Sequence, residues 1–363
     1  MSKVAMLGIG TAVPAFRLDQ RDVASRLAMI LEGRPERARW VNRIFTHCGV
    51  ETRYTCEPNL LEAGDRCRYV SASDVARFPT TAERMTLYRE ASVPLAVEAA
   101  FKALADAGTR AREITHLLVA SCTGMFLPGL DAELAWRLDL AVDVERRPLT
   151  FLGCAAGLTA LRESIRIVRG NPDAKVLVVT VELCSIHIQP TLSKEDLFTA
   201  SLFGDGASAC VVAMPGAGRE GAFALRDACS AMFPESKSMM EWTIGDYGFR
   251  LSLSPRIPEL ITSHTCDAVT EFWGERAAPA LWAIHPGGRG IIDAVQQTFK
   301  LADDQTAASR TILRDYGNLS SATILFVMDA LRRQEDKRSG LSEGIAVAFG
   351  PGVSAELLRF ERR

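Results

Sequence analysis

Apolar runs typical of buried strands alternate with helical apolar patterns along the first half of the chain. Strand-like runs occur at residues 4–10, 114–122 and 175–181, and helical patterns lie between them, the longest at residues 81–108. Strands that alternate with helices form a mostly parallel sheet whose faces are covered by helices. We therefore expect an α/β fold. We also expect Asp19 to cap a helix that runs through Val23, Leu27 and Leu31, and we expect Pro94 to kink or split the longest helix.

The chain has 363 residues, which is enough for two domains or for one large two-part unit. Residues 214–221 are rich in glycine, alanine and proline, and this segment is the best candidate for a boundary between two halves. We expect an N-terminal half at 1–217 and a C-terminal half at 218–363. Each half contains a strand that stops at a reactive residue before a helix, Cys154 in one and His285 in the other. This shared pattern indicates a pseudo-duplicated fold.

Composition narrows the class of protein and its partners. A net charge of −2 gives no basic surface suited to nucleic acid. The nine cysteines are odd in number and form no Cys-x-x-Cys pair, so we expect reduced thiols. The apolar run at the start is too short for a signal peptide, and no window approaches the roughly 20 apolar residues of a membrane span. We expect a soluble, cytoplasmic protein.

Cys154 lies where a strand pattern meets a helix pattern. A run of strand-forming residues ends at Gly153, and helical apolar positions begin at Leu158. The free N–H groups and positive dipole end of a helix N-terminus favour a thiolate, which lowers the pKa of a cysteine and makes it a nucleophile. The alternative is that Cys154 is simply a small buried hydrophobe, as most free cysteines are.

His285 and Asn318 are the other candidate reactive residues. His285 ends a strand pattern and precedes a glycine turn, and Asn318 directly precedes a helix, where a plain N-cap role would also explain it. Cysteine, histidine and asparagine together suit acyl transfer through a thioester, with a thiolate as acceptor and two N–H donors for an oxyanion. A papain-like hydrolase shares this chain order, but the Cys-Gly-Ser-Cys-Trp signature of that family is missing.

Five motifs, in order, resemble those of the type III polyketide synthases, the chalcone and stilbene synthase superfamily. The resemblance covers nearly the whole chain and implies a thiolase-like fold with two pseudo-duplicated αβαβα halves. The ketoacyl synthase that starts fatty-acid synthesis is a same-fold alternative, but it usually has its asparagine shortly after the histidine. The motifs are GCAAG at 153–157, LFGDGA at 202–207, HPGG at 285–288, GNLSS at 317–321 and FGPG at 349–352.

The resemblance implies a role for each motif residue. Cys154 takes the starter acyl group from coenzyme A, and His285 and Asn318 hold the carbonyl of malonyl-CoA while it loses carbon dioxide. His285 would also keep Cys154 ionised as an imidazolium partner. Phe203 matches an aromatic gate between the coenzyme A tunnel and the cavity. The resemblance implies no metal and no prosthetic group, with coenzyme A thioesters as the substrates.

Two further residues match family positions outside the catalytic motifs. Arg43 matches a basic position that contacts the coenzyme A phosphates, although the two neighbouring family lysines are Trp40 and His47 here. Leu127 matches a residue that reaches across a dimer to close the partner's cavity. The resemblance therefore implies a homodimer.

The cavity positions depart from those of the plant enzymes. His187 and Cys184 stand where the chalcone synthases carry threonines, Leu251 replaces a gate phenylalanine, and Trp242 replaces a cavity glycine. These positions are most similar to bacterial members that extend fatty acyl starters to alkylpyrones or alkylresorcinols. We therefore predict a medium or long acyl starter. A plant-like or malonyl-primed synthase, a ketoacyl synthase, a Cys-His-Asn hydrolase and a catalytically silent binding protein remain the alternatives.

Overall fold

The computed structural model describes residues 4–31, 35–62, 66–69, 77–216, 221–234, 236–334 and 342–362. Nine of the described strands form one sheet, and they are β1 (Ala5–Ala12), β4 (His116–Ser121), β5 (Glu145–Thr150), β6 (Lys175–Leu183), β7 (Asp205–Ala213), β8 (Phe223–Met232), β11 (Leu281–Ile284), β12 (Ser342–Gly350) and β13 (Ser354–Arg362). Their order across the sheet is β11-β12-β13-β8-β1-β7-β6-β4-β5. The two halves of the sheet join where Ala5 and Met6 of β1 pair with Ala224 and Phe223 of β8, next to a hydrogen bond from the Leu225 N–H to the Val4 carbonyl.

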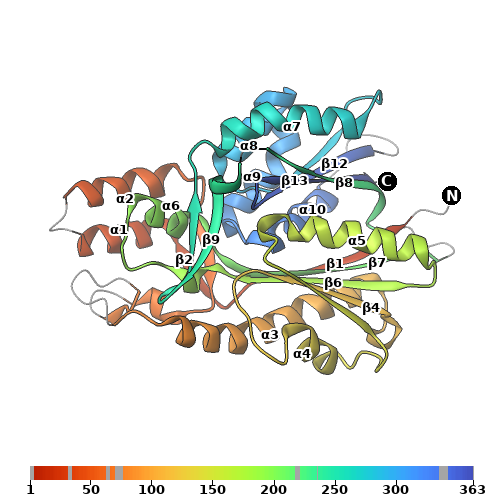
Figure 1. Cartoon of the computed structure of the whole chain (residues 1–363), viewed down its shortest axis with the longest axis horizontal. Coiled ribbons are helices and arrows are strands. Elements are labelled where there is room, and N and C mark those ends of the chain that lie inside the picture. Colours follow the sequence, from red (N-terminus) through yellow and green to blue (C-terminus); the bar gives the residue numbers. More distant parts are fainter. Residues whose placement is uncertain are drawn as a thin grey trace.

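Seven helices cover the two halves of the sheet, and they are α3 (Thr81–Ala107), α4 (Leu130–Arg137), α5 (Ala156–Gly170), α7 (Ile257–Trp273), α8 (Arg289–Phe299), α9 (Asp303–Tyr316) and α10 (Thr323–Arg333). Helices α5, α9 and α10 pack between the halves in the largest apolar core. Helices α3 and α4 cover one outer face, and α7 and α8 cover the other (Figure 1). This layering confirms the predicted αβαβα, thiolase-like fold.

The strand order shows how the two halves correspond. From the centre outward, β1-β7-β6-β4-β5 in one half matches β8-β13-β12-β11 in the other, and the described residues hold no counterpart of β5. Helix α5 therefore corresponds to α10, so Cys154 before α5 corresponds to Asn318 before α10. His285 follows β11 and corresponds to Cys122, which follows β4. The predicted duplication is therefore present, and Cys154 and His285 follow strands that do not correspond in the two halves.

Two sequence predictions about local structure meet different outcomes. Asp19 caps α1 (Gln20–Ile30), since its side chain accepts hydrogen bonds from the backbone N–H groups of Arg21 and Asp22, as expected. Helix α3 runs unbroken through Pro94, which contradicts the predicted split. The missing N–H of a proline costs one helical hydrogen bond. The alanine-rich face of α3 packs on the sheet over the whole length of the helix, and this burial offsets that loss. The predicted boundary between residues 217 and 218 lies outside the described residues.

The remaining helices and strands flank the sheet and contribute residues to the walls of two cavities. They are α1, β2 (Phe16–Asp19), α2 (Pro35–His47), β3 (Thr52–Thr55), α6 (Lys194–Leu202), β9 (Met240–Gly245) and β10 (Gly248–Leu253). Strands β2 and β3 pair with each other, and so do β9 and β10. Among the helices that the structure describes, none is both long and apolar enough to cross a membrane.

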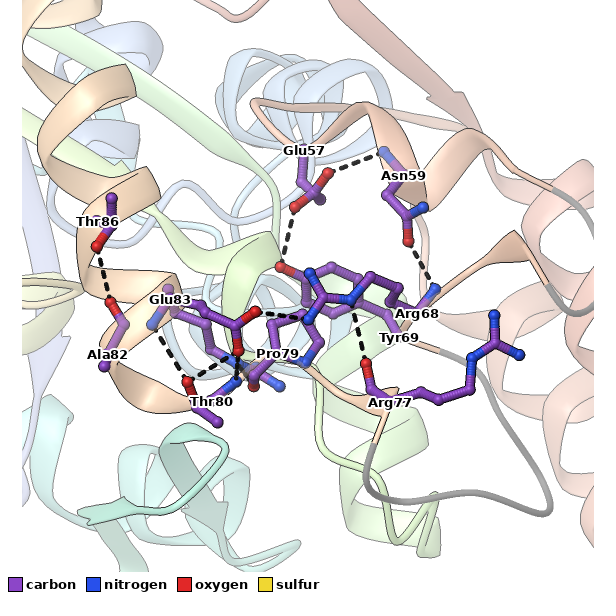
Figure 2. A network of polar contacts seen from close by, with 11 residues as sticks. Glu57, Asn59, Arg68, Tyr69, Arg77, Pro79, Thr80, Ala82, Glu83 and Thr86 are labelled. Atoms are coloured by element: carbon purple, nitrogen blue, oxygen red, sulfur yellow. Dashed lines mark hydrogen bonds and ion pairs between the residues drawn. The ribbon is translucent and has the colours of Figure 1, made fainter.

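A polar network joins the chain after β3 to the start of α3 (Figure 2). The hydroxyl of Tyr69 donates to Glu57 at 3.1 Å, and Arg68 donates to Glu83 at 2.6 Å. Thr80 and Glu83 form a reciprocal capping box at the N-terminus of α3, which satisfies N–H groups that have no partner within the helix. These contacts hold the described residues after β3 against the body of the protein.

Candidate active site

The three predicted catalytic residues line one cavity of about 440 Å³. Cys154 lies in the short helix η5 (Gly153–Ala155) between β5 and α5, and His285 directly follows β11. Asn318 precedes the short helix η8 (Ser320–Ala322), which leads into α10. The structure therefore brings together residues from both halves, although 164 positions of sequence separate Cys154 from Asn318.

A close approach of α5 to η8 places the asparagine beside the cysteine. A side chain on Gly157 would put its Cβ 2.5 Å from the carbonyl oxygen of Ser321, so only glycine permits this contact. The Nδ2 amide of Asn318 lies 3.9 Å from the Cys154 sulfur. Its Oδ1 accepts from the Ser320 backbone N–H at 2.8 Å. Asn318 thus caps the following turn with its oxygen, while its amide donor faces the thiol.

His285 is buried with both ring nitrogens unpartnered in the part of the chain that the structure describes. Burial lowers the pKa of His285 to about 3, so its imidazole is neutral at physiological pH. A neutral imidazole offers one N–H donor and one acceptor nitrogen. Protein groups of the described residues satisfy neither nitrogen, and His285 lines the cavity that also contains Cys154 and Asn318.

Burial also sets the protonation state of Cys154. It raises the pKa of the thiol to about 11, and hydrogen bonds from Ser320 and Asn318 oppose the shift only in part. Cys154 does lie just before a helix N-terminus, as expected. Desolvation of both groups nevertheless acts against the thiolate–imidazolium pair, because it raises the pKa of Cys154 and lowers that of His285.

Glu182 at the end of β6 is a site residue that the sequence analysis missed. Its carboxylate is fully buried and accepts hydrogen bonds from the Cys122 backbone N–H at 3.0 Å and the Thr123 hydroxyl at 2.7 Å. The Ser320 hydroxyl links this cluster to Cys154, since it lies 3.4 Å from the Cys122 sulfur and 3.7 Å from that of Cys154. The signal was a single carboxylate at the end of an otherwise apolar strand.

A second, narrower cavity of about 90 Å³ adjoins the catalytic one. Phe203, Trp242 and Leu251 line both cavities, so they form the wall between them. Trp242 and Leu251 are register partners on β9 and β10, which explains why they reach the same place. The distal wall is mostly apolar and comes largely from α1, for example Val23, Leu27 and Ile30.

The structure places His187 and Cys184 at the second cavity rather than at the catalytic one. The Nδ1 of His187 accepts the Phe249 backbone N–H at 3.0 Å, so its Nε2 carries the proton that is donated to the Thr123 carbonyl at 2.7 Å. Its ring stacks on Phe249 with centroids 4.6 Å apart. Burial lowers the pKa of His187 to about 3, and both ring nitrogens are occupied. His187 is therefore a wall residue and not an acid or base.

Arg43 and Leu127 lie outside both cavities of the subunit. Arg43 is exposed on α2, next to Ile44, which lines the mouth of the catalytic cavity. Leu127 is 91% exposed on the loop between β4 and α4. A large apolar side chain so exposed has no packing partner within its own subunit.

Comparisons with known proteins agree with this fold and site. The model of the chalcone and stilbene synthases, N-terminal domain, matches residues 1–216, and that of the C-terminal domain matches residues 224–361. The alpha-pyrone synthesis polyketide synthase-like Pks18 of Mycobacterium tuberculosis is 31% identical over 98% of this chain and 90% of its own length. The 1,3,6,8-tetrahydroxynaphthalene synthase of Streptomyces peucetius is 32% identical over 98% of this chain and 92% of its own.

Solved structures give the same result. The C-terminal type III polyketide synthase domain of Steely1 from Dictyostelium superposes with a TM-score of 0.89 at 27% identity and covers 99% of both chains. A polyketide synthase from the brown alga Ectocarpus siliculosus gives 0.89 at 26% identity, covering 100% of this chain and 99% of its own. The fold and these likenesses define a condensing acyltransferase of the thiolase class. The chain belongs to the chalcone and stilbene synthase family and is a type III polyketide synthase.

Alkylation of Cys154 by iodoacetamide should depend steeply on pH. Because burial keeps the thiol neutral, the rate should rise about tenfold per pH unit between pH 6 and pH 9 as the thiolate fraction grows. Mass spectrometry of the peptide that contains Cys154 measures this rate separately from the other cysteines. A rate that is already constant below pH 7 would instead show a preformed thiolate–imidazolium pair.

Proposed function

We propose that this synthase loads a medium- or long-chain fatty acyl group from coenzyme A onto Cys154. It then extends the chain by repeated decarboxylative condensation with malonyl-CoA and cyclises it to an alkylpyrone or alkylresorcinol. The observation that carries the proposal is the narrow apolar cavity beside the catalytic one. An alkyl chain attached to Cys154 can pass Phe203 and Trp242 and bury its distal methylenes there.

Loading needs a proton acceptor, because burial keeps the Cys154 thiol neutral. The neutral ring of His285 has a free acceptor nitrogen, so it takes the thiol proton as the sulfur attacks the acyl carbonyl. The Cys154–acyl bond forms, the bond to coenzyme A breaks, and the departing thiolate takes the proton back. No charge has to persist in the buried cavity between turnovers.

Extension uses His285 and Asn318 as hydrogen-bond donors. Their N–H groups hold the thioester oxygen of malonyl-CoA, so the enolate that forms when carbon dioxide leaves is stabilised. The enolate carbon attacks the Cys154 thioester, a carbon–carbon bond forms, and the cysteine is released as a thiolate. The proposed steps use only side chains of this protein and coenzyme A thioesters, without a metal or prosthetic group.

The geometry favours condensation over the hydrolase alternative. In a Cys-His-Asn hydrolase the asparagine orients the histidine. Here the Asn318 amide faces the Cys154 sulfur at 3.9 Å and the Gly287 carbonyl at 3.5 Å. It is therefore placed to act on the same substrate atoms as the histidine. The name of the Mycobacterium tuberculosis relative supports an α-pyrone product. The name of the Streptomyces peucetius relative makes a tetrahydroxynaphthalene the second candidate product.

A panel of acyl-CoA starters from two to sixteen carbons tests the proposal. With malonyl-CoA present, kcat/KM should rise about fourfold for each methylene that enters the second cavity, since one buried methylene is worth about 0.8 kcal/mol. Mass spectrometry identifies the products. Turnover with only malonyl or aromatic starters would contradict the proposal.

The variant Ala200→Phe can be tested with the same panel of starters, and acetyl-CoA serves as the internal control. Ala200 on α6 lines the second cavity only, so a phenylalanine there should shorten the longest accepted starter by several carbons. Acetyl-CoA does not reach this cavity, and its turnover should stay unchanged.

We propose that coenzyme A phosphates bind at the mouth of the catalytic cavity, near Arg43. Lys194 and Arg289 are exposed and line this cavity, so two further cations are available to the phosphates. Arg43→Ala should raise the KM for malonyl-CoA about fivefold, because an exposed ion pair is worth at most about 1 kcal/mol. Arg110→Ala, which removes an exposed arginine elsewhere, is the control. If the KM of Arg43→Ala for malonyl-CoA is unchanged, Arg43 does not bind the coenzyme A phosphates.

We also propose that the enzyme is a homodimer that forms along β5. This edge strand is exposed over most of its length, and an unpaired edge is ready to pair with a second copy. Exposed apolar side chains accompany it on the same half of the chain, namely Met125, Leu127, Trp136, Val142 and Phe151. A dimer through this face would bury them and bring Leu127 toward the partner.

Light scattering on the purified protein tests the dimer. The wild type should have twice the mass of one chain, and Leu127→Asp combined with Trp136→Asp should shift it to the monomer, because two charges would enter an apolar interface. Ile244→Asp is the matched control, since Ile244 is equally large and exposed but lies on β9. A monomeric wild type, or a dimer unaffected by the double variant, would contradict the proposal.

A further inference from the structure

Arg53 on β3 is a buried cation whose hydrogen bonds go to backbone carbonyls. It is 3% exposed, and its Nη1 donates to the carbonyls of Ala200 and Phe203, the latter at 2.8 Å. These two carbonyls lie at the C-terminal end of α6, where a positive charge interacts favourably with the helix dipole. Its Nε is buried without a partner in the described part of the chain.

The segment that Arg53 holds is bonded directly to the catalytic asparagine. Phe203 and Asn318 form an isolated β-bridge. The Gly204 N–H donates to the Asn318 carbonyl at 3.0 Å, and the Asn318 N–H donates to the Leu202 carbonyl at 2.9 Å. The position of Asn318 is therefore set by the end of α6, and the end of α6 is held by Arg53.

The stem of Arg53 also packs against the residue before Asn318. Gly317 has φ +70°, and a Cβ there would lie 2.9 Å from the Cγ of Arg53. Both the glycine conformation and the lack of a side chain are needed for this contact. Arg53 thus contacts both strands of the bridge, one through its guanidinium and the other through its stem.

A purely structural role explains this arrangement poorly. Burial lowers the pKa of Arg53 to about 10, and although the group stays protonated at neutral pH, taking a cation out of water destabilises the fold. An apolar side chain of similar volume would fill the space without that cost. What such a side chain could not do is donate to two carbonyls at the end of α6.

We propose that Arg53 is a positioning residue that holds Phe203 and Asn318 in register, and so shapes the malonyl-binding half of the site. The inference rests on the proposed function. Cys154 belongs to η5, which Arg53 does not hold, so loading of the starter depends on a different part of the fold. Arg53 therefore acts on decarboxylation of malonyl-CoA and not on acylation of the cysteine.

Two separate assays on the enzyme test whether Arg53 acts on decarboxylation and not on acylation. Carbon dioxide release from malonyl-CoA alone reports on His285 and Asn318. Single-turnover acylation of Cys154 by acetyl-CoA reports on loading, because Arg53 also lines the second cavity and acetyl-CoA does not reach it. In Arg53→Met, kcat for decarboxylation should fall about ten- to hundredfold with KM nearly unchanged, because misplacing a catalytic group by about 1 Å costs this much. Acylation of Cys154 should stay within about twofold of wild type. Arg53→Lys, which keeps the charge and can reach one carbonyl, should lie between.

Arg84 provides a matched control for the loss of a buried arginine. It is also fully buried, and its guanidinium donates to the carbonyls of Pro79, Ile186 and Ile188, away from the bridge. Arg84→Met should lose thermal stability comparable to Arg53→Met and retain decarboxylation. If Arg53→Met does not fold, the decarboxylation rates of Arg53→Lys and Arg84→Lys are compared instead.

The outcomes separate this inference from the proposed function. Equal losses in decarboxylation and acylation, or equal losses in the Arg53 and Arg84 variants, would show that Arg53 only supports the fold. Cys154→Ala, which cannot carry an acyl group, should still release carbon dioxide. If the wild type releases none from malonyl-CoA, both the proposed function and the role of Arg53 fail. If the wild type releases carbon dioxide and Arg53→Met releases it at the same rate, only the proposed role of Arg53 is contradicted.

Discussion

The contact between α5 and η8 is the one on which the rest of the site depends. Gly157 lets the two come within a distance that any side chain would block, and the starts of two corresponding helices meet there. Cys154 precedes α5, and Asn318 precedes the corresponding helix α10 in the other half. The duplication itself therefore brings the two side chains together. His285 enters from the end of β11, so the site exists only where the two halves join.

The same packing determines the electrostatics of the site. It buries His285 and leaves Cys154 only partly exposed, and this desolvation favours their neutral forms. Glu182 and Arg53 are buried nearby, and their hydrogen-bond partners are neutral groups. Donors held in place before the reaction begins are suited to a negative charge that develops only in the transition state.

Much of the fold was predictable because it follows from local periodicity. The strand β1, the cap at Asp19 and the alternation of strands and helices were all expected from residue patterns. The continuity of α3 through Pro94 was not, because packing of the helix against the sheet decides it. The correspondence of Cys154 with Asn318 was hidden for a similar reason, since it depends on strand order, which no local pattern records.

By itself, the sequence determined the chemistry that is available: a cysteine, a histidine and an asparagine, each at the boundary of a strand or a helix. Only the tertiary structure decided their charge and their surroundings. The pKa of Cys154 depends on groups such as Ser320 and Glu182 that are remote in sequence. The second cavity depends on the register that sets Trp242 opposite Leu251. Burial and register are properties of the packed chain, so no single segment carries them.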